Sequence, residues 1–300
     1  MPVVNNWPMT RVAIDDGLAQ TGVDPRVLVI LQGVSDEIRR QAEDYAEREP
    51  RLLVWSHDPP LPSLSATWNR ALEFVWACGG EEALVVNNDV RLHPETYVQL
   101  HVLSDLTDAL FISAVGVREG QFSAHEDLPA AIWGTVDPHD HYDEALAVLR
   151  NGGTLDAAKR EIVTNLPKGG PDFSCFLLSQ VCHAAYPFDE AFIPAYCEDL
   201  DYHRRLMLEG DGQRIFSVNL PYLHYASRTV NSYTPEEQQR FAKRVQQSRS
   251  HYRQKWGGDV NQEAYTVPYA PESTRNDVTT PELQRRVQAG ESMLPELEAI

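Results

Sequence analysis

Short β-rich runs alternate with helical segments through the first third of this chain, and this alternation constrains the fold more than any other feature. Residues 27–31, 52–55 and 84–86 are apolar runs of the kind that form buried strands. A helix is expected from Ser35 to about Glu49, and another from Trp68 to Ala77, ending at a Gly-Gly pair. This order predicts an α/β protein with a parallel sheet. Ligands of such sheets bind at the carboxyl ends of the strands.

Composition excludes several classes of protein. The chain has 300 residues, 42% of them hydrophobic, and a net charge of −18. That charge argues against a large contact surface for nucleic acid or anionic lipid. No apolar stretch approaches the ~20 residues that span a bilayer, and the N-terminus does not resemble a signal peptide. The four cysteines show no CxxC pairing, so we expect reduced thiols in a cytoplasmic protein.

The strand at 84–86 runs directly into Asn87-Asn88-Asp89. A carboxylate at the end of a strand can bind a hard divalent cation, and neighbouring amides can contact a ribose or a phosphate. An Asx-type turn before Pro94 would use the same residues. The triplet alone does not decide between these two interpretations.

Two later segments also carry candidate chemistry. Glu198, Asp199 and Asp201 fall at a predicted helix start, where the helix dipole favours carboxylates and where they could equally serve catalysis. Arg205 lies one turn after Asp201 and could pair with it or contact phosphate. His224 follows a β-like stretch, and either a structural role or a metal site with a carboxylate and phosphate oxygens would suit it.

The remainder of the chain divides by composition. Residues 118–167 are polar and irregular, which indicates an insertion or an acceptor-side loop region. A helix is expected over 234–254 with Thr234 as N-cap and Pro235 at its first position. We therefore predict a catalytic domain over 1–230, a C-terminal helix within 231–270 that packs on it, and a polar tail over 271–300 that is either a docking helix at 281–298 or largely disordered.

Four segments of the chain, taken in order, resemble GT-A-fold inverting glycosyltransferases. They are the NND strand, the EDxD block with its arginine and leucine, the H-x-x-S segment and Lys255-Trp256-Gly257-Gly258. The resemblance is to the rhamnosyltransferase-like branch of the large family 2, and it covers about residues 5–268. It implies a Rossmann-like, mostly parallel central sheet flanked by helices, with a C-terminal helical extension. It also implies transfer of a hexose from a nucleotide-diphosphate sugar (UDP, dTDP or GDP sugar) to a hydroxyl acceptor, with inversion.

The resemblance assigns roles to individual residues. Asp89 would ligate Mn²⁺ or Mg²⁺, with His224 joining the metal or the diphosphate. Asp199 would be the general base, and Glu198 its neighbour at the acceptor hydroxyl. The donor-binding residues would be Asn5, Gln32, Asn69, Asn87, Asn88, Asp172 and Arg205. Because the triplet carries two asparagines, the metal site would have one anionic ligand instead of two.

Three functions remain open at this point. The first is transfer to a saccharide of a surface or capsular glycan, and the second is the same chemistry on a hydroxylated DNA base, against which the net charge speaks. The third is a catalytically silent nucleotide-sugar-binding module. A nucleotidyltransferase would need a Gly-rich, basic phosphate loop after the first strand, and the sequence has none there. The C-terminal helix and tail are where we expect a contact in a homodimer.

Overall fold

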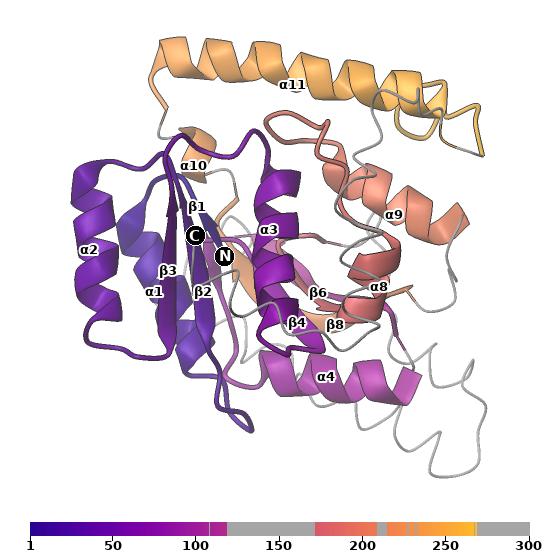
Figure 1. The fold of residues 1–300 in the computed structure, drawn as a ribbon. Coiled ribbons are helices and arrows are strands. Elements are labelled where there is room, and N and C mark those ends of the chain that lie inside the picture. Colours follow the sequence, from indigo (N-terminus) through magenta and orange to yellow (C-terminus); the bar gives the residue numbers. More distant parts are fainter. Residues whose placement is uncertain are drawn as a thin grey trace. The chain divides into compact units, whose positions relative to one another are not determined.

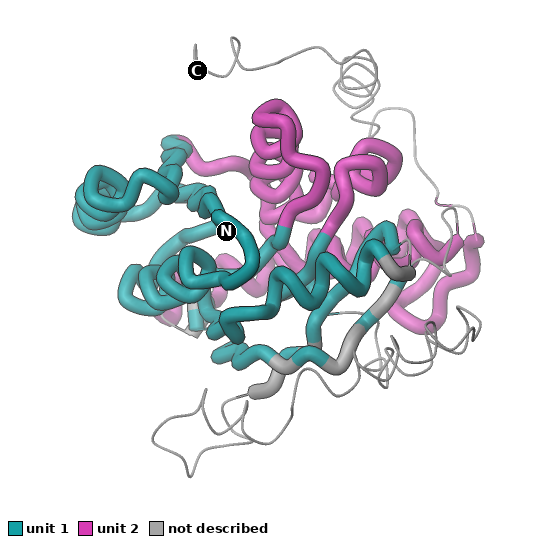
Figure 2. The backbone as a smooth tube through the Cα atoms, turned by 90° about the horizontal axis from the view of Figure 1, so that it is seen from below, with its two compact units in different colours: residues 1–58, 84–177, 213–232 teal, residues 59–83, 178–212, 233–300 magenta. Residues whose placement is uncertain are grey.

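The computed structural model describes residues 1–107, 109–118, 172–208, 215–226, 228–231, 233–266 and 268. Almost all of the predicted 118–167 region, the 271–300 tail and the 281–298 helix lie outside the described residues. The chain forms two compact units that interleave in sequence (Figure 2). Unit 1 comprises residues 1–58, 84–177 and 213–232, and unit 2 comprises residues 59–83, 178–212 and 233–300. Each unit is described by itself.

Unit 1 begins with a parallel three-stranded sheet. Its strands are β1 (Pro2–Val3), β2 (Val27–Gln32) and β3 (Leu52–His57), with β2 in the centre (Figure 1). Helices α1 (Trp7–Leu18) and α2 (Asp36–Ala46) contribute Ile14 and Ala42 to the apolar core beneath β2. The side chain of Ser35 accepts a hydrogen bond from the Ile38 amide and starts α2. The strands predicted at 27 and 52, and the helix from Ser35, are confirmed.

A second sheet carries the remaining strands. Its order is β4-β7-β6-β8-β5, formed by β4 (Glu82–Val86), β7 (Cys175–Ser179), β6 (Phe111–Arg118), β8 (Ile215–His224) and β5 (Val90–Arg91). β6 runs parallel to β8, whereas β5 is antiparallel to it. Helix α4 (Thr96–Thr107) contacts β6, and the short helix α10 (Arg228–Asn231) follows β8. The strands therefore fall into two sheets, and the second sheet has an antiparallel edge strand, β5. The sequence does not predict this strand, because two residues are too short to show a strand pattern.

Unit 2 is built largely from helices. It contains α3 (Leu64–Ala77), α8 (Gln180–Ala185), α9 (Glu198–Leu208) and α11 (Pro235–Trp256). α3 begins at Leu64, earlier than the predicted Trp68, because the Ser63 hydroxyl caps it through the Ala66 amide. The predicted N-cap Thr234 of α11 is confirmed, and it forms a capping box with Glu237.

The core of unit 2 joins α11 to the segment before α9. Phe192, Cys197, Tyr252 and Trp256 are buried against one another.

Cys175, Cys182 and Cys197 are buried and Cys78 is exposed, all four as free thiols, as predicted. Among the described helices, none combines the length and the apolar character that a membrane crossing requires.

Candidate functional site

Asp89 and His224 form a pair at one edge of the second sheet. The antiparallel pairing of β5 with β8 sets Val90 opposite His224, and the Tyr225 amide donates to the Asp89 carbonyl at 3.0 Å. Asp89 Oδ1 then lies 3.4 Å from His224 Nε2, with the two side chains 8% and 18% exposed. Two residues that the sequence singled out separately thus meet in unit 1.

Asn88 points into unit 1 instead of out of it. Its Nδ2 donates to the Asn5 carbonyl at 3.1 Å and to Thr10 Oγ1 at 3.0 Å, and the residue is 7% exposed. Asn5 and Asn88, both predicted donor contacts, are therefore brought together by a bond that fixes the turn onto α1. On Asn87, the backbone amide donates to the Ser174 carbonyl.

Asp16 of α1 and Gln20, two residues beyond the end of that helix, hold the segment that follows Asp89. Asp16 accepts from Arg91 Nε at 2.6 Å and Nη2 at 3.3 Å, and also from the Leu92 amide at 3.0 Å. Gln20 Nε2 donates to the His93 carbonyl, and its Oε1 accepts from the Tyr97 amide at the start of α4. Sequence reasoning missed Asp16 and Gln20, because their partners are more than seventy positions away and leave no local pattern.

Asp172 lies beside the same strand as His224. Its Oδ1 accepts from the Ser174 amide at 2.9 Å. Its Oδ2 and the Tyr222 hydroxyl cover Gly116, where an added Cβ would meet them at 2.5 and 2.9 Å. The Tyr222 ring is 6.2 Å from that of His224, and burial, together with the charge of Asp172, raises the pKa of Tyr222 well above its usual value. Tyr222 is a neighbour of the site that the sequence did not point to.

The three acids at the start of α9 differ sharply in their surroundings. Asp201 is fully buried and accepts hydrogen bonds from Arg205 Nε at 2.9 Å and Trp256 Nε1 at 2.9 Å. Lys255 Nζ is 2.8 Å from the same carboxylate. The predicted pairing of Asp201 with Arg205 is confirmed, and Asp201 is an internal anchor for α11.

Arg205 is committed to that interior. Its Nη2 donates to the Pro187 carbonyl at 2.9 Å, its guanidinium lies over the Tyr202 ring, and the residue is 9% exposed. These contacts occupy the guanidinium inside unit 2. The donor contact expected of Arg205 stays a prediction.

Glu198 is also buried, at 5% exposed, but it lacks such partners. Its Oε2 has no hydrogen-bond partner among the described residues. Burial, followed by the charge of neighbouring Asp199, raises the pKa of Glu198 well above its ordinary value. Asp199 itself is partly exposed, and its Oδ1 accepts from the Leu200 amide at 2.8 Å. Of the three acids, Asp199 is the one that is not buried.

A further acid ties α11 to the segment before α9. Asp189 Oδ2 is 3.0 Å from His251 Nε2 and 2.7 Å from Lys255 Nζ. Burial alone would favour the neutral acid, but His251, Lys255 and the Ala191 amide together hold the pKa of Asp189 well below its usual range.

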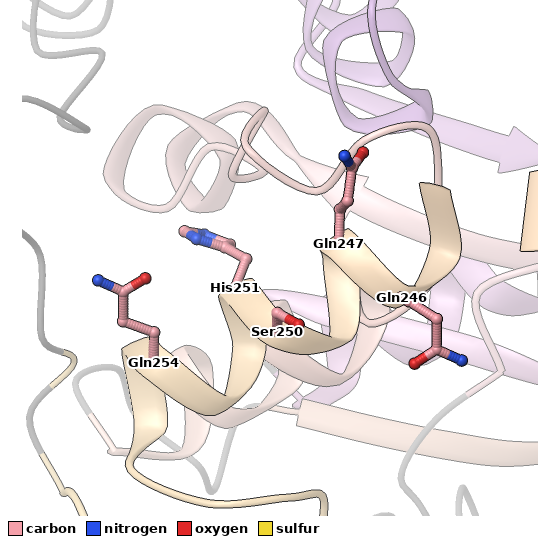
Figure 3. A pocket seen from close by; sticks show the side chains of 5 residues that line it. All are labelled: Gln246, Gln247, Ser250, His251 and Gln254. Carbon is pink, nitrogen blue, oxygen red and sulfur yellow. The ribbon is translucent and has the colours of Figure 1, made fainter. Parts of the chain in front are cut away.

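α11 also borders a shallow pocket of about 390 Å³. It is lined by Gln246, Gln247, Ser250, His251 and Gln254, and Figure 3 shows Gln246 and Gln247 pointing in opposite directions. The described residues predicted for the site do not line this pocket.

Two predicted donor residues are internal. Gln32 ends β2, opposite His57 of β3, and is 7% exposed. Asn69 is 5% exposed and bonds both backbone groups of Phe188.

Asp89 and His224 lie in unit 1, whereas Glu198 and Asp199 lie in unit 2. Three or more acidic, His or Cys side chains do not cluster at a metal-binding distance anywhere in the described chain.

Comparison with known proteins identifies the fold. No family model and no curated protein matches the sequence. The structure is similar to a mannosyltransferase from Pyrobaculum calidifontis, solved with GDP-mannose and Mn²⁺, at a TM-score of 0.52 and 13% identity, covering 96% of this chain and 71% of that one. The chain therefore has the GT-A glycosyltransferase fold, as its sequence resemblance implied.

Two other solved structures match less closely. Glucosyl-3-phosphoglycerate synthase from Mycobacterium tuberculosis matches at a TM-score of 0.47 and 16% identity, over 82% of this chain and 75% of that one. S. aureus TarS matches at 0.49 and 12%, over 84% and 70%. Of these three structures, the mannosyltransferase has a TM-score above 0.5, and the fold assignment rests on it.

Proposed function

We propose that this protein is an inverting, nucleotide-sugar-dependent glycosyltransferase of the rhamnosyltransferase-like branch of family 2. It transfers a hexose to a hydroxyl acceptor, most simply a saccharide. The observation that carries the proposal is the 3.4 Å approach of Asp89 to His224 at the sheet edge of a GT-A fold. The mannosyltransferase with this fold was solved with both a nucleotide sugar and Mn²⁺.

The Asp89–His224 pair fits a divalent cation. A carboxylate oxygen and an imidazole nitrogen are both ligands that Mn²⁺ accepts, and the two side chains are close enough to share one ion. A cation bound there would neutralise negative charge on the diphosphate of the donor. With one anionic side chain in the pair, donor oxygens and water would supply the remaining ligands.

Asp199 is the proposed base. An inverting transfer needs a carboxylate that accepts the proton of the acceptor hydroxyl while that oxygen attacks the anomeric carbon and the nucleoside diphosphate leaves. Asp199 has exposed surface, whereas Glu198 is buried with a raised pKa and stays protonated over a wider range of pH.

The proposed donor contacts follow from position. Asp172 lies beside Tyr222, whose ring is 6.2 Å from that of His224, and would meet a sugar hydroxyl. Asn87, at the end of β4, and Gln32, at the end of β2, would face the nucleotide. Asn88 and Asn5 act on the donor through the turn that they fix together.

Thermal unfolding with a panel of UDP, GDP, dTDP and CMP sugars tests the proposal. We expect one donor class to raise the melting temperature with Mn²⁺ present and to lose that effect in EDTA. Purified protein should also hydrolyse that donor slowly. Absence of a shift with every donor would contradict the proposal, and shifts that ignore the metal would exclude Asp89 and His224 as its ligands.

A further inference from the structure

The segment that leads into Glu198 and Asp199 is an irregular loop over residues 186–197. It contains no helix or strand, and Tyr196 and Cys197 have φ of 78° and 71°, a region that non-glycine residues rarely adopt. Such a loop keeps one conformation only if its surroundings determine it. The position of Asp199 therefore depends on what holds this loop.

Asn69 of α3 holds the start of the loop through all of its hydrogen-bonding capacity. Its Oδ1 accepts from the Phe188 amide at 2.9 Å, and its Nδ2 donates to the Phe188 carbonyl at 2.8 Å. The side chain thus pairs with one residue of backbone in both directions, as a neighbouring strand would. Nδ2 also donates to Glu190 Oε1 at 3.0 Å.

His183 of α8 completes the arrangement. The indole N–H of Trp76 can only donate, and it lies 3.0 Å from His183 Nδ1, so that nitrogen must accept. The ring proton is then on Nε2, which donates to Asn69 Oδ1 at 3.1 Å. Burial lowers the pKa of His183 to about 3, which keeps this neutral tautomer at working pH.

Other contacts hold the remainder of the loop. The Leu64 amide donates to the Pro194 carbonyl at 2.8 Å, and Ser248 of α11 donates to the Ile193 carbonyl at 3.0 Å. Asn69 differs from these, because it is a fully satisfied, 5% exposed side chain that fixes both backbone groups of one residue. Its amide is left with no free group for a ligand.

We propose that Asn69 is a positioning residue, which sets the 186–197 loop and through it Asp199, and does not contact the nucleotide-sugar donor. The inference rests on the proposed function. It replaces the donor contact that the sequence resemblance implied with an internal role that the four hydrogen bonds of the side chain describe.

Kinetics of Asn69→Ala and Asn69→Asp test this assignment. Because a misplacement of about 1 Å can cost about a hundredfold in rate, we expect kcat to fall ~100-fold in Asn69→Ala. The Kd for the donor with Mn²⁺ should stay within about threefold of wild type, because a residue that does not touch the donor makes no direct contribution to donor binding. Asn69→Asp keeps the oxygen that accepts from the Phe188 amide, but it replaces the donating NH2 with a carboxylate oxygen that faces the Phe188 carbonyl and the Glu190 carboxylate, so it should lose at least as much of kcat as Asn69→Ala. Arg70→Ala, an exposed neighbour on α3, is the matched control.

The opposite result would overturn the assignment. A donor Kd raised tenfold or more with kcat unchanged would mean that Asn69 contacts the donor. Unchanged kcat and Kd in folded Asn69→Ala would mean that the loop does not depend on it. Amide exchange at Phe188, measured on the same variants, should accelerate whether or not the protein transfers a sugar. If wild type binds no nucleotide sugar, the proposed function fails while this exchange result still judges the network.

Discussion

Two sites, one in each unit, show how differently an aspartate side chain can be used. In unit 1, Asp89 shares its surroundings with a single imidazole, and its carboxylate lies 3.4 Å from His224. In unit 2, Asp201 is fully buried among Arg205, Lys255 and Trp256. Among the described residues, the first carboxylate has one side-chain partner and the second has three.

Neighbouring acids in one motif need not share a role. Glu198, Asp199 and Asp201 lie within a single helical turn, yet burial and partners separate them. Asp201 is neutralised by cations and anchors α11, Glu198 is favoured in its neutral form, and Asp199 is partly exposed. Substituting each in turn therefore separates catalysis, stability and pH dependence.

The largest effect is expected for Asp199→Asn. Loss of a general base typically costs 10²–10⁴-fold, so we expect about a thousandfold loss of kcat with the donor Kd within a few-fold of wild type. Steady-state transfer to an identified acceptor measures this. Asp44→Asn, an exposed acid on α2, is the control. Full transfer activity in Asp199→Asn would show that the base lies elsewhere.

Asp201→Ala should cost stability instead. Removing one partner of a buried ion pair leaves the other charge uncompensated and typically costs about 3–5 kcal/mol. Urea unfolding should show this loss, because Arg205 remains buried without its carboxylate, whereas Lys255 keeps Asp189. Asp199→Asn, by comparison, should unfold near wild type. A change below about 1 kcal/mol in Asp201→Ala would mean that the network is dispensable.

Glu198→Gln should change how stability depends on pH. The pKa of Glu198 is raised in the folded protein, so above the unfolded-state pKa the folded state holds more protons than the unfolded state. Its contribution is therefore complete at low pH and is lost as pH rises through the folded pKa, with a slope of at most about 1.4 kcal/mol per pH unit. Gln has no proton to lose, so this slope should disappear in the variant.

Melting temperatures from pH 4 to 8 measure the slope. The exposed Glu37→Gln should keep the wild-type slope, because its carboxyl is not buried. Parallel curves for wild type and Glu198→Gln would contradict the assignment of a buried, neutral Glu198.

Local features of this fold could be read from the sequence, whereas long-range ones could not. The β2 strand, the capping box at Thr234 and the Asp201–Arg205 pair arise from residues within one turn or one strand, so their patterns are visible in the chain. The meeting of Asp89 with His224 was suggested by resemblance alone. The Asp16–Arg91 and Asn69–Phe188 contacts join distant segments, and no periodicity encodes them.

The most direct test of the division of roles between the two units is Mn²⁺-dependent donor binding by Asp89→Asn, with Asp199→Asn measured in parallel by titration calorimetry. We predict that Asp89→Asn weakens Mn²⁺-dependent binding of the nucleotide sugar by at least roughly 10–100-fold, because loss of a residue that merely orients a metal ligand already costs that much. We also predict that Asp199→Asn binds like wild type. Equal binding by wild type and Asp89→Asn would contradict the account.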